Sequence, residues 1–177
     1  MLWSLSRIAA GPLMLRGVAL GTGFAALLLA VPALLGESRL FLVAAVLAAI
    51  AAIGVGTPWV SLLEHLAVVG WFAATTWYGY PISSTQALGL AAAIYLHHTS
   101  CALAAVLPLD AAVAPAVLVG WLRRAGAVLA VSLPLGAAVL ALPDAWGRSG
   151  QIWLPIGGLA ALLAGAYTLL HLSRAPH

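Results

Sequence analysis

The chain has 177 residues, of which 64% are hydrophobic and only 6% are charged. A typical soluble domain carries about 25% charged residues, so this chain could not cover a soluble fold with polar groups. The formal net charge of +3 results from seven basic residues, all of them arginine, against four acidic residues. No basic run interleaved with aromatic residues indicates a nucleic-acid surface. We therefore expect an integral membrane protein whose main partner is the lipid bilayer and which binds no nucleic acid.

Apolar segments of about 20 residues are long enough to cross a bilayer as helices. Polar residues, glycine and proline divide the chain into six such segments: 17–35, 40–56, 59–79, 86–107, 122–142 and 151–171. The turn at Thr57-Pro58 either separates two full spans or belongs to a re-entrant hairpin, and the length of the two flanking segments favours two crossings. The sequence predicts an all-α protein, a single transmembrane domain over 1–177 formed by a bundle of about six helices.

The arginines indicate the orientation of this bundle. With six crossings, five of them share one side of the membrane and two lie on the other: Arg7, Arg16, Arg123, Arg124 and Arg174 against Arg39 and Arg148. Arginine is enriched in cytoplasmic loops, which places both termini in the cytoplasm. Tryptophan and tyrosine at the predicted span ends form the aromatic belt expected there. We expect a multi-pass protein of a bacterial inner (plasma) membrane.

Two segments combine apolar and aromatic residues with arginine, namely 1–16 and 112–124. This pattern is typical of helices that lie in the membrane interface. The same segments could equally extend the neighbouring spans.

Ionisable side chains inside a span are costly and mark functional positions by default. Here they are Glu64 and His65 in the third span and His97 and His98 in the fourth, all in the cytoplasmic half. Helical steps of three and four from His97 reach only small or polar residues: Ala93, Ser100, Cys101 and Ala104. We therefore expect His97 to point into the bundle and His98 to lie on a flanking face. A contact between Glu64 and a histidine is the expected link between these spans.

Several kinds of chemistry could use this cluster. Haem b would need two axial histidines at matching depth on different helices, and His97 has no such partner. A metal site could combine Glu64, His65 and one of the two other histidines, although no close ligand motif supports it. A proton-coupled or solute pathway could use Glu64 and His97, or the groups could simply hydrogen-bond and fix helix packing. No motif names a catalytic residue, a cofactor-binding residue or a metal ligand, so we expect no cofactor; enzyme activity stays open, with a non-enzymatic role favoured.

Small residues at four-residue spacing let transmembrane helices approach closely. Such faces occur in the first and sixth spans, at Gly17 and Gly21 and at Gly157, Ala161 and Gly165. They serve packing within the chain or association with another membrane subunit. The leading hypothesis is thus a non-enzymatic accessory or scaffold subunit of a larger membrane complex. The alternative is a small transporter or ligand-binding subunit that uses Glu64 and His97 on an unknown small-molecule substrate.

The stretch 96–126 reads LHHTSCALAAVLPLDAAVAPAVLVGWLRRAG. It resembles small actinobacterial polytopic membrane proteins encoded beside MoxR-type ATPases. The resemblance implies an accessory role beside an envelope or chaperone-like system and supplies no catalytic residues. In architecture alone, the predicted bundle is also similar to the substrate-binding subunits of energy-coupling-factor vitamin transporters, which dock through a small-residue first helix.

Overall fold

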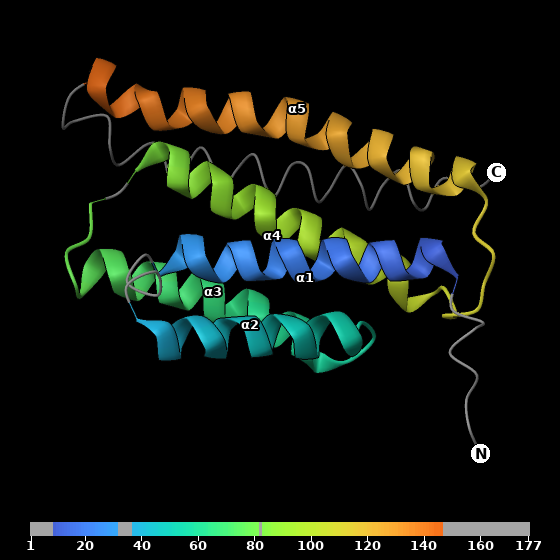
Figure 1. Ribbon diagram of the computed structural model, residues 1–177. Helices are drawn as coiled ribbons and strands as arrows, with labels where there is room; N and C mark the ends of the chain where they lie inside the picture. Colours follow the sequence, from blue (N-terminus) through green and yellow to red (C-terminus); the bar gives the residue numbers. More distant parts are fainter. Residues whose placement is uncertain (1–8, 32–36, 82, 147–177) are drawn as a thin grey trace. The chain divides into compact units, whose positions relative to one another are not determined.

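The computed structural model describes residues 9–31, 37–81 and 83–146, the last five of these by their backbone only. Within these ranges the secondary structure is entirely helical, which confirms the all-α prediction (Figure 1). The helices are α1 (Ala10–Ala30), α2 (Ser38–Ile53), α3 (Pro58–Thr76), α4 (Ser84–Ala105) and α5 (Pro115–Trp146).

Three of the described helices are long and apolar enough to cross a membrane: α1, α4 and residues Pro115–Ala141 of α5. The chain is therefore a membrane protein with transmembrane helices, as predicted. Helix α2 is equally apolar but has 16 residues, and α3 has 19 residues with Glu64 and His65 in its sequence. The predicted sixth span, with Gly157, Ala161 and Gly165, lies outside the described residues.

Helices α1 and α5 begin earlier than the spans predicted from the sequence. Helix α1 already includes Pro12, and α5 starts at Pro115. Proline is well tolerated in the first turn of a helix, where its missing N–H would have no intrahelical partner. Residues 10–16 and 115–124 therefore belong to the same continuous helices as the neighbouring spans. Of the two interpretations of these segments, this favours extensions of the spans over separate interfacial helices.

The contacts divide the chain into two compact units, residues 1–133 and 134–177, with the boundary inside α5. In the first unit α1 is the central helix: its largest interface is with α4, and it also packs against α2 and α3. Figure 1 shows α1 running between α4 and α2. In the second unit, the described part is the continuation of α5.

Three hydrogen bonds fix α1 and α4 as an antiparallel pair. Gln86 Nε2 donates to the Leu29 carbonyl at 2.6 Å, and His97 Nδ1 lies 2.8 Å from the Ala19 carbonyl oxygen. Just beyond the ends of the two helices, the Ala9 N–H donates to the carbonyl of Leu109 at 2.9 Å. Successive bonds are about three helical turns apart along both partners, so they lock one register along the whole interface.

The interior of this unit consists mainly of small residues. Along α1 the buried positions recur every three or four residues: Pro12, Leu15, Ala19, Gly23, Ala26, Leu27 and Ala30. On α2 all four buried positions are alanine. Small side chains let helix backbones approach closely, so that van der Waals contact can hold helices together in a lipid environment. A polar ring in such an interior must find both space and a hydrogen-bonding partner.

The start of α1, the turn between α2 and α3, and the loop between α4 and α5 lie at one end of the first unit. A Cβ atom on Gly11 would lie 3.0 Å from the Cβ of Val113, and one on Gly56 would lie 3.9 Å from the Cβ of Ala105. Arg16 lies in the half of α1 nearest this end, and Arg123 and Arg124 lie in the corresponding half of α5. Arg39 is at the start of α2, one helix length away.

Candidate functional site

His97 joins α4 to the backbone of α1. Its side chain is completely buried, and its Nδ1 lies 2.8 Å from the carbonyl oxygen of Ala19. Because a carbonyl oxygen only accepts, Nδ1 carries the proton and donates. One turn further along α1, a Cβ on Gly23 would lie 2.7 Å from Nδ1 and 2.8 Å from Cε1 of the ring. The absence of a side chain at Gly23 therefore creates the space that the imidazole occupies.

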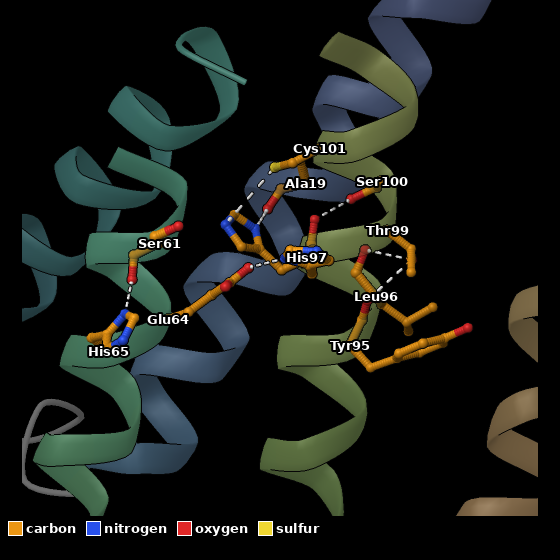
Figure 2. A network of polar contacts seen from close by, with 11 residues as sticks. Ala19, Ser61, Glu64, His65, Tyr95, Leu96, His97, Thr99, Ser100 and Cys101 are labelled. Atoms are coloured by element: carbon orange, nitrogen blue, oxygen red, sulfur yellow. Dashed lines mark hydrogen bonds and ion pairs between the residues drawn. The ribbon is translucent and has the colours of Figure 1, made fainter. Parts of the chain in front are cut away.

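The other contacts of His97 come from its own helix. The Sγ of Cys101, which is 1% exposed, lies 3.9 Å from Nε2, and the Ser100 hydroxyl donates to the His97 carbonyl at 3.0 Å (Figure 2). The face predicted to point inward from His97 is buried at every position: Ala93, Ser100, Cys101 and Ala104. The structure thus confirms that His97 points into the bundle.

Glu64 and His98 form the polar contact between α3 and α4. Glu64 Oε1 lies 3.1 Å from His98 Nδ1, and 63% of the His98 side chain is exposed against 16% of the Glu64 side chain. The expected contact between Glu64 and a histidine is therefore present, and the histidine is His98, not His97. Adjacent residues diverge by about 100° around a helix, so when one imidazole faces α1 the next faces α3.

The Glu64–His98 pair lies within the apolar part of both helices. With a rise of about 1.5 Å per residue, Glu64 is roughly 9 Å along the axis from Pro58, and His98 is roughly 10 Å from Ala105. Since these two helix ends lie at the same end of the unit, the two residues have matching depth. Measured along α4, which is long and apolar enough to cross a membrane, this distance is about one third of a hydrocarbon core about 30 Å thick.

His65 lies apart from the other three residues of the predicted polar cluster. Its Nδ1 is 2.6 Å from the Ser61 carbonyl oxygen of its own helix, and the side chain is exposed (Figure 2). Within the part of the chain that the structure describes, no three histidine, cysteine or acidic side chains are grouped so that they could hold a metal ion. The structure therefore brings together Glu64 and His98, and separately His97 and Cys101.

The small residues of α1 that receive His97 are Ala19 and Gly23, which the sequence reasoning missed. They have the same four-residue spacing as Gly17 and Gly21, the pair singled out from the sequence. Gly17 and Gly21 are exposed, and a Cβ on either would meet nothing within 4 Å. Periodicity gives the spacing of a packing face, but a glycine-rich helix offers several such faces. Pro12, Leu15 and Ala26 are buried on the same side of α1 as Ala19 and Gly23. Their burial identifies this side as the packing face.

Arg16, which the sequence predicted to flank the membrane, is partly buried among the helices. Its Nη1 is buried and has no hydrogen-bond partner in the described ranges, and the same holds for Nε1 of Trp121.

Comparison of the chain with protein-family models, with curated protein sequences and with solved structures found no match.

Proposed function

We propose that this chain is a non-enzymatic accessory or scaffold subunit of a larger membrane complex in the bacterial plasma membrane. The observation that carries the proposal is the role of His97. This fully buried ionisable group donates to a backbone carbonyl of α1 and fills the space above Gly23. It is thus engaged in holding two helices together, as polar side chains between transmembrane helices commonly are.

The outer surfaces of the helices support association with lipid and with other subunits. Large apolar side chains are exposed along α2, α3 and α5, among them Leu42, Val69, Phe72 and Val131. On the outer face of α1, Gly17 and Gly21 leave the backbone accessible to a neighbouring helix. A surface of this kind fits a protein that works through contacts within the membrane.

The proposal includes six crossings with both termini in the cytoplasm. Its support is the common position of the start of α1, the α2–α3 turn and the α4–α5 loop, together with the arginines near that end. A cysteine placed in the α2–α3 turn of a variant lacking Cys101 should react with a membrane-impermeant maleimide only after the cells are broken. Labelling in intact cells would contradict this orientation.

Purification of the tagged chain from its native membrane in mild detergent tests the proposed function. We expect a different protein to co-purify in a fixed ratio. The resemblance of residues 96–126 to proteins encoded beside MoxR-type ATPases makes such an ATPase, or a membrane partner of one, the first candidate. A lone, stable monomer whose thermal stability rises with a small molecule would contradict a scaffold role.

The Glu64–His98 contact favours a second candidate function, a small proton- or solute-coupled transporter or ligand-binding subunit. An ionisable pair at this depth is typical of transport pathways. The sequence suggested Glu64 and His97 for this role; the geometry supports Glu64 with His98, because His97 is engaged with α1. Proteoliposomes containing a pH-sensitive dye would measure proton entry. If Glu64→Gln and His98→Ala conduct protons or solute as the parent does, the transporter proposal fails.

A further inference from the structure

His98 presents a polar ring on the outside of the first unit at a depth where lipid chains are expected. Its Nδ1 contacts Glu64, while 63% of the side chain is exposed and Nε2 has no hydrogen-bond partner among the described residues. A polar group left without a hydrogen-bond partner in hydrocarbon is strongly unfavourable. This exposed ring therefore needs a partner that supplies a hydrogen-bonding group at the same depth.

The surface of α4 on either side of His98 is suited to another helix. Ala91, Ala102 and Ala105 are exposed and Tyr95 is partly exposed. Together with His98 they recur at alternating steps of four and three residues. This is the seven-residue repeat of a helix seam that packs against a second helix with a left-handed crossing. Three of the five side chains are methyl groups, so the second helix could approach closely.

The Glu64–His98 pair is complementary to itself. A protonated imidazole donates from both nitrogens, and a carboxylate accepts through both oxygens. A two-fold axis along the membrane normal brings together residues of equal depth, and Glu64 and His98 have matching depth. Two copies related in this way would therefore place two imidazoles and two carboxylates in one layer, where imidazole nitrogens and carboxylate oxygens can pair.

We propose that a second copy of this chain packs α4 against α4 along this seam, and that His98 Nε2 of each copy hydrogen-bonds to the partner's Glu64. The chain itself carries, in Glu64, a carboxylate that can accept from His98 Nε2 at this depth. The inference goes beyond the proposed function, because the dimer would form whether or not other subunits join it.

Disulfide cross-linking in liposomes that contain only this protein tests the proposal. In a Cys101→Ala background, Ala102→Cys and Ala105→Cys each place one thiol on the seam. The matched control is Val69→Cys, on a residue of α3 that is 59% exposed and lies off the seam. We expect the seam variants to form a disulfide-linked dimer that persists when the protein is diluted with lipid. The control should cross-link only through collisions, which dilution removes.

A second measurement tests the role of His98. His98→Leu keeps a side chain of similar size without hydrogen bonding. We expect it to lower the dimer association constant about tenfold, because each dimer loses two interhelical hydrogen bonds, one from each copy. Absence of cross-linking at both seam positions, or equal cross-linking at Val69, overturns the proposed dimer. A dimer that His98→Leu leaves unchanged overturns the pairing of His98 with the partner's Glu64. Because the liposomes hold no other protein, these outcomes are independent of the co-purification test.

Discussion

Replacing Gly23 by alanine tests the contact between α1 and α4 directly. The new Cβ would lie 2.7 Å from Nδ1 and 2.8 Å from Cε1 of His97, whereas ordinary van der Waals contacts are at 3.4–4 Å. The ring would have to retreat by more than half an ångström, but the buried 2.8 Å bond to the Ala19 carbonyl and the contact with Cys101 oppose this movement. Gly23→Ala should therefore strain the packing and weaken the hydrogen bond at the same time.

The size of this effect can be estimated from its parts. Overpacking costs about 1–3 kcal/mol, and leaving a buried polar group poorly bonded costs about 1–3 kcal/mol. Alanine returns about 1 kcal/mol through its better helix propensity. We expect a net loss of about 3 kcal/mol, which corresponds to a fall in Tm of about 6–12 °C for a chain of this size. Thermal unfolding of the detergent-solubilised protein, followed by tryptophan fluorescence, measures it.

Gly17→Ala, in the same helix, is the matched control. A Cβ at Gly17 would meet nothing within 4 Å. Its Tm should stay the same or rise. In addition, Gly23→Ala combined with His97→Ala should lose less stability than the two single changes added together, because removing the ring removes the clash. If Gly23→Ala unfolds at the same temperature as Gly17→Ala, or if the double variant is strictly additive, the proposed packing of His97 on α1 is wrong.

Three further predictions concern the same bundle. Gln86→Leu removes the hydrogen bond to the Leu29 carbonyl and should lower the stability by about 1–3 kcal/mol, because that partly buried acceptor is left unpaired. The control is Thr85→Ala at the exposed neighbouring position, and an equal Tm for the two variants would contradict the prediction. A Cβ on Gly70 would lie 2.9 Å from Cγ2 of Val31, so Gly70→Ala should lower the Tm and Val31→Ala should restore part of the loss; no rescue would refute this contact. Cys101 is 1% exposed and should react with a maleimide much more slowly in mild detergent than in SDS. Gly23→Ala should accelerate the reaction in mild detergent. Equal rates in both detergents would show that the thiol is accessible.

Much of this organisation follows from the sequence, since periodicity fixes which residues share a face. The steps from His97 identified the buried side of α4, because an α-helix repeats its faces every three or four residues. The same reasoning could not decide which histidine meets Glu64, since this depends on the rotation of α4 relative to both α1 and α3. Nor could it select Gly23 over Gly17 and Gly21. Glycine has no side chain to show a preference, so its role becomes visible only when the opposing ring is in place.

The antiparallel pairing of α1 and α4 has a consequence for how the chain matures in the membrane. The bond between His97 and Ala19 joins residues 78 positions apart. At a synthesis rate of about 5–20 residues per second, α1 would wait about 4–16 s for its main partner. During that interval α2 and α3 are already emerging, and the space above Gly23 is still unfilled. The packing of α1 is thus completed only after α4 has been synthesised. A nascent chain truncated before His97 should therefore expose the inner face of α1 to the insertion machinery.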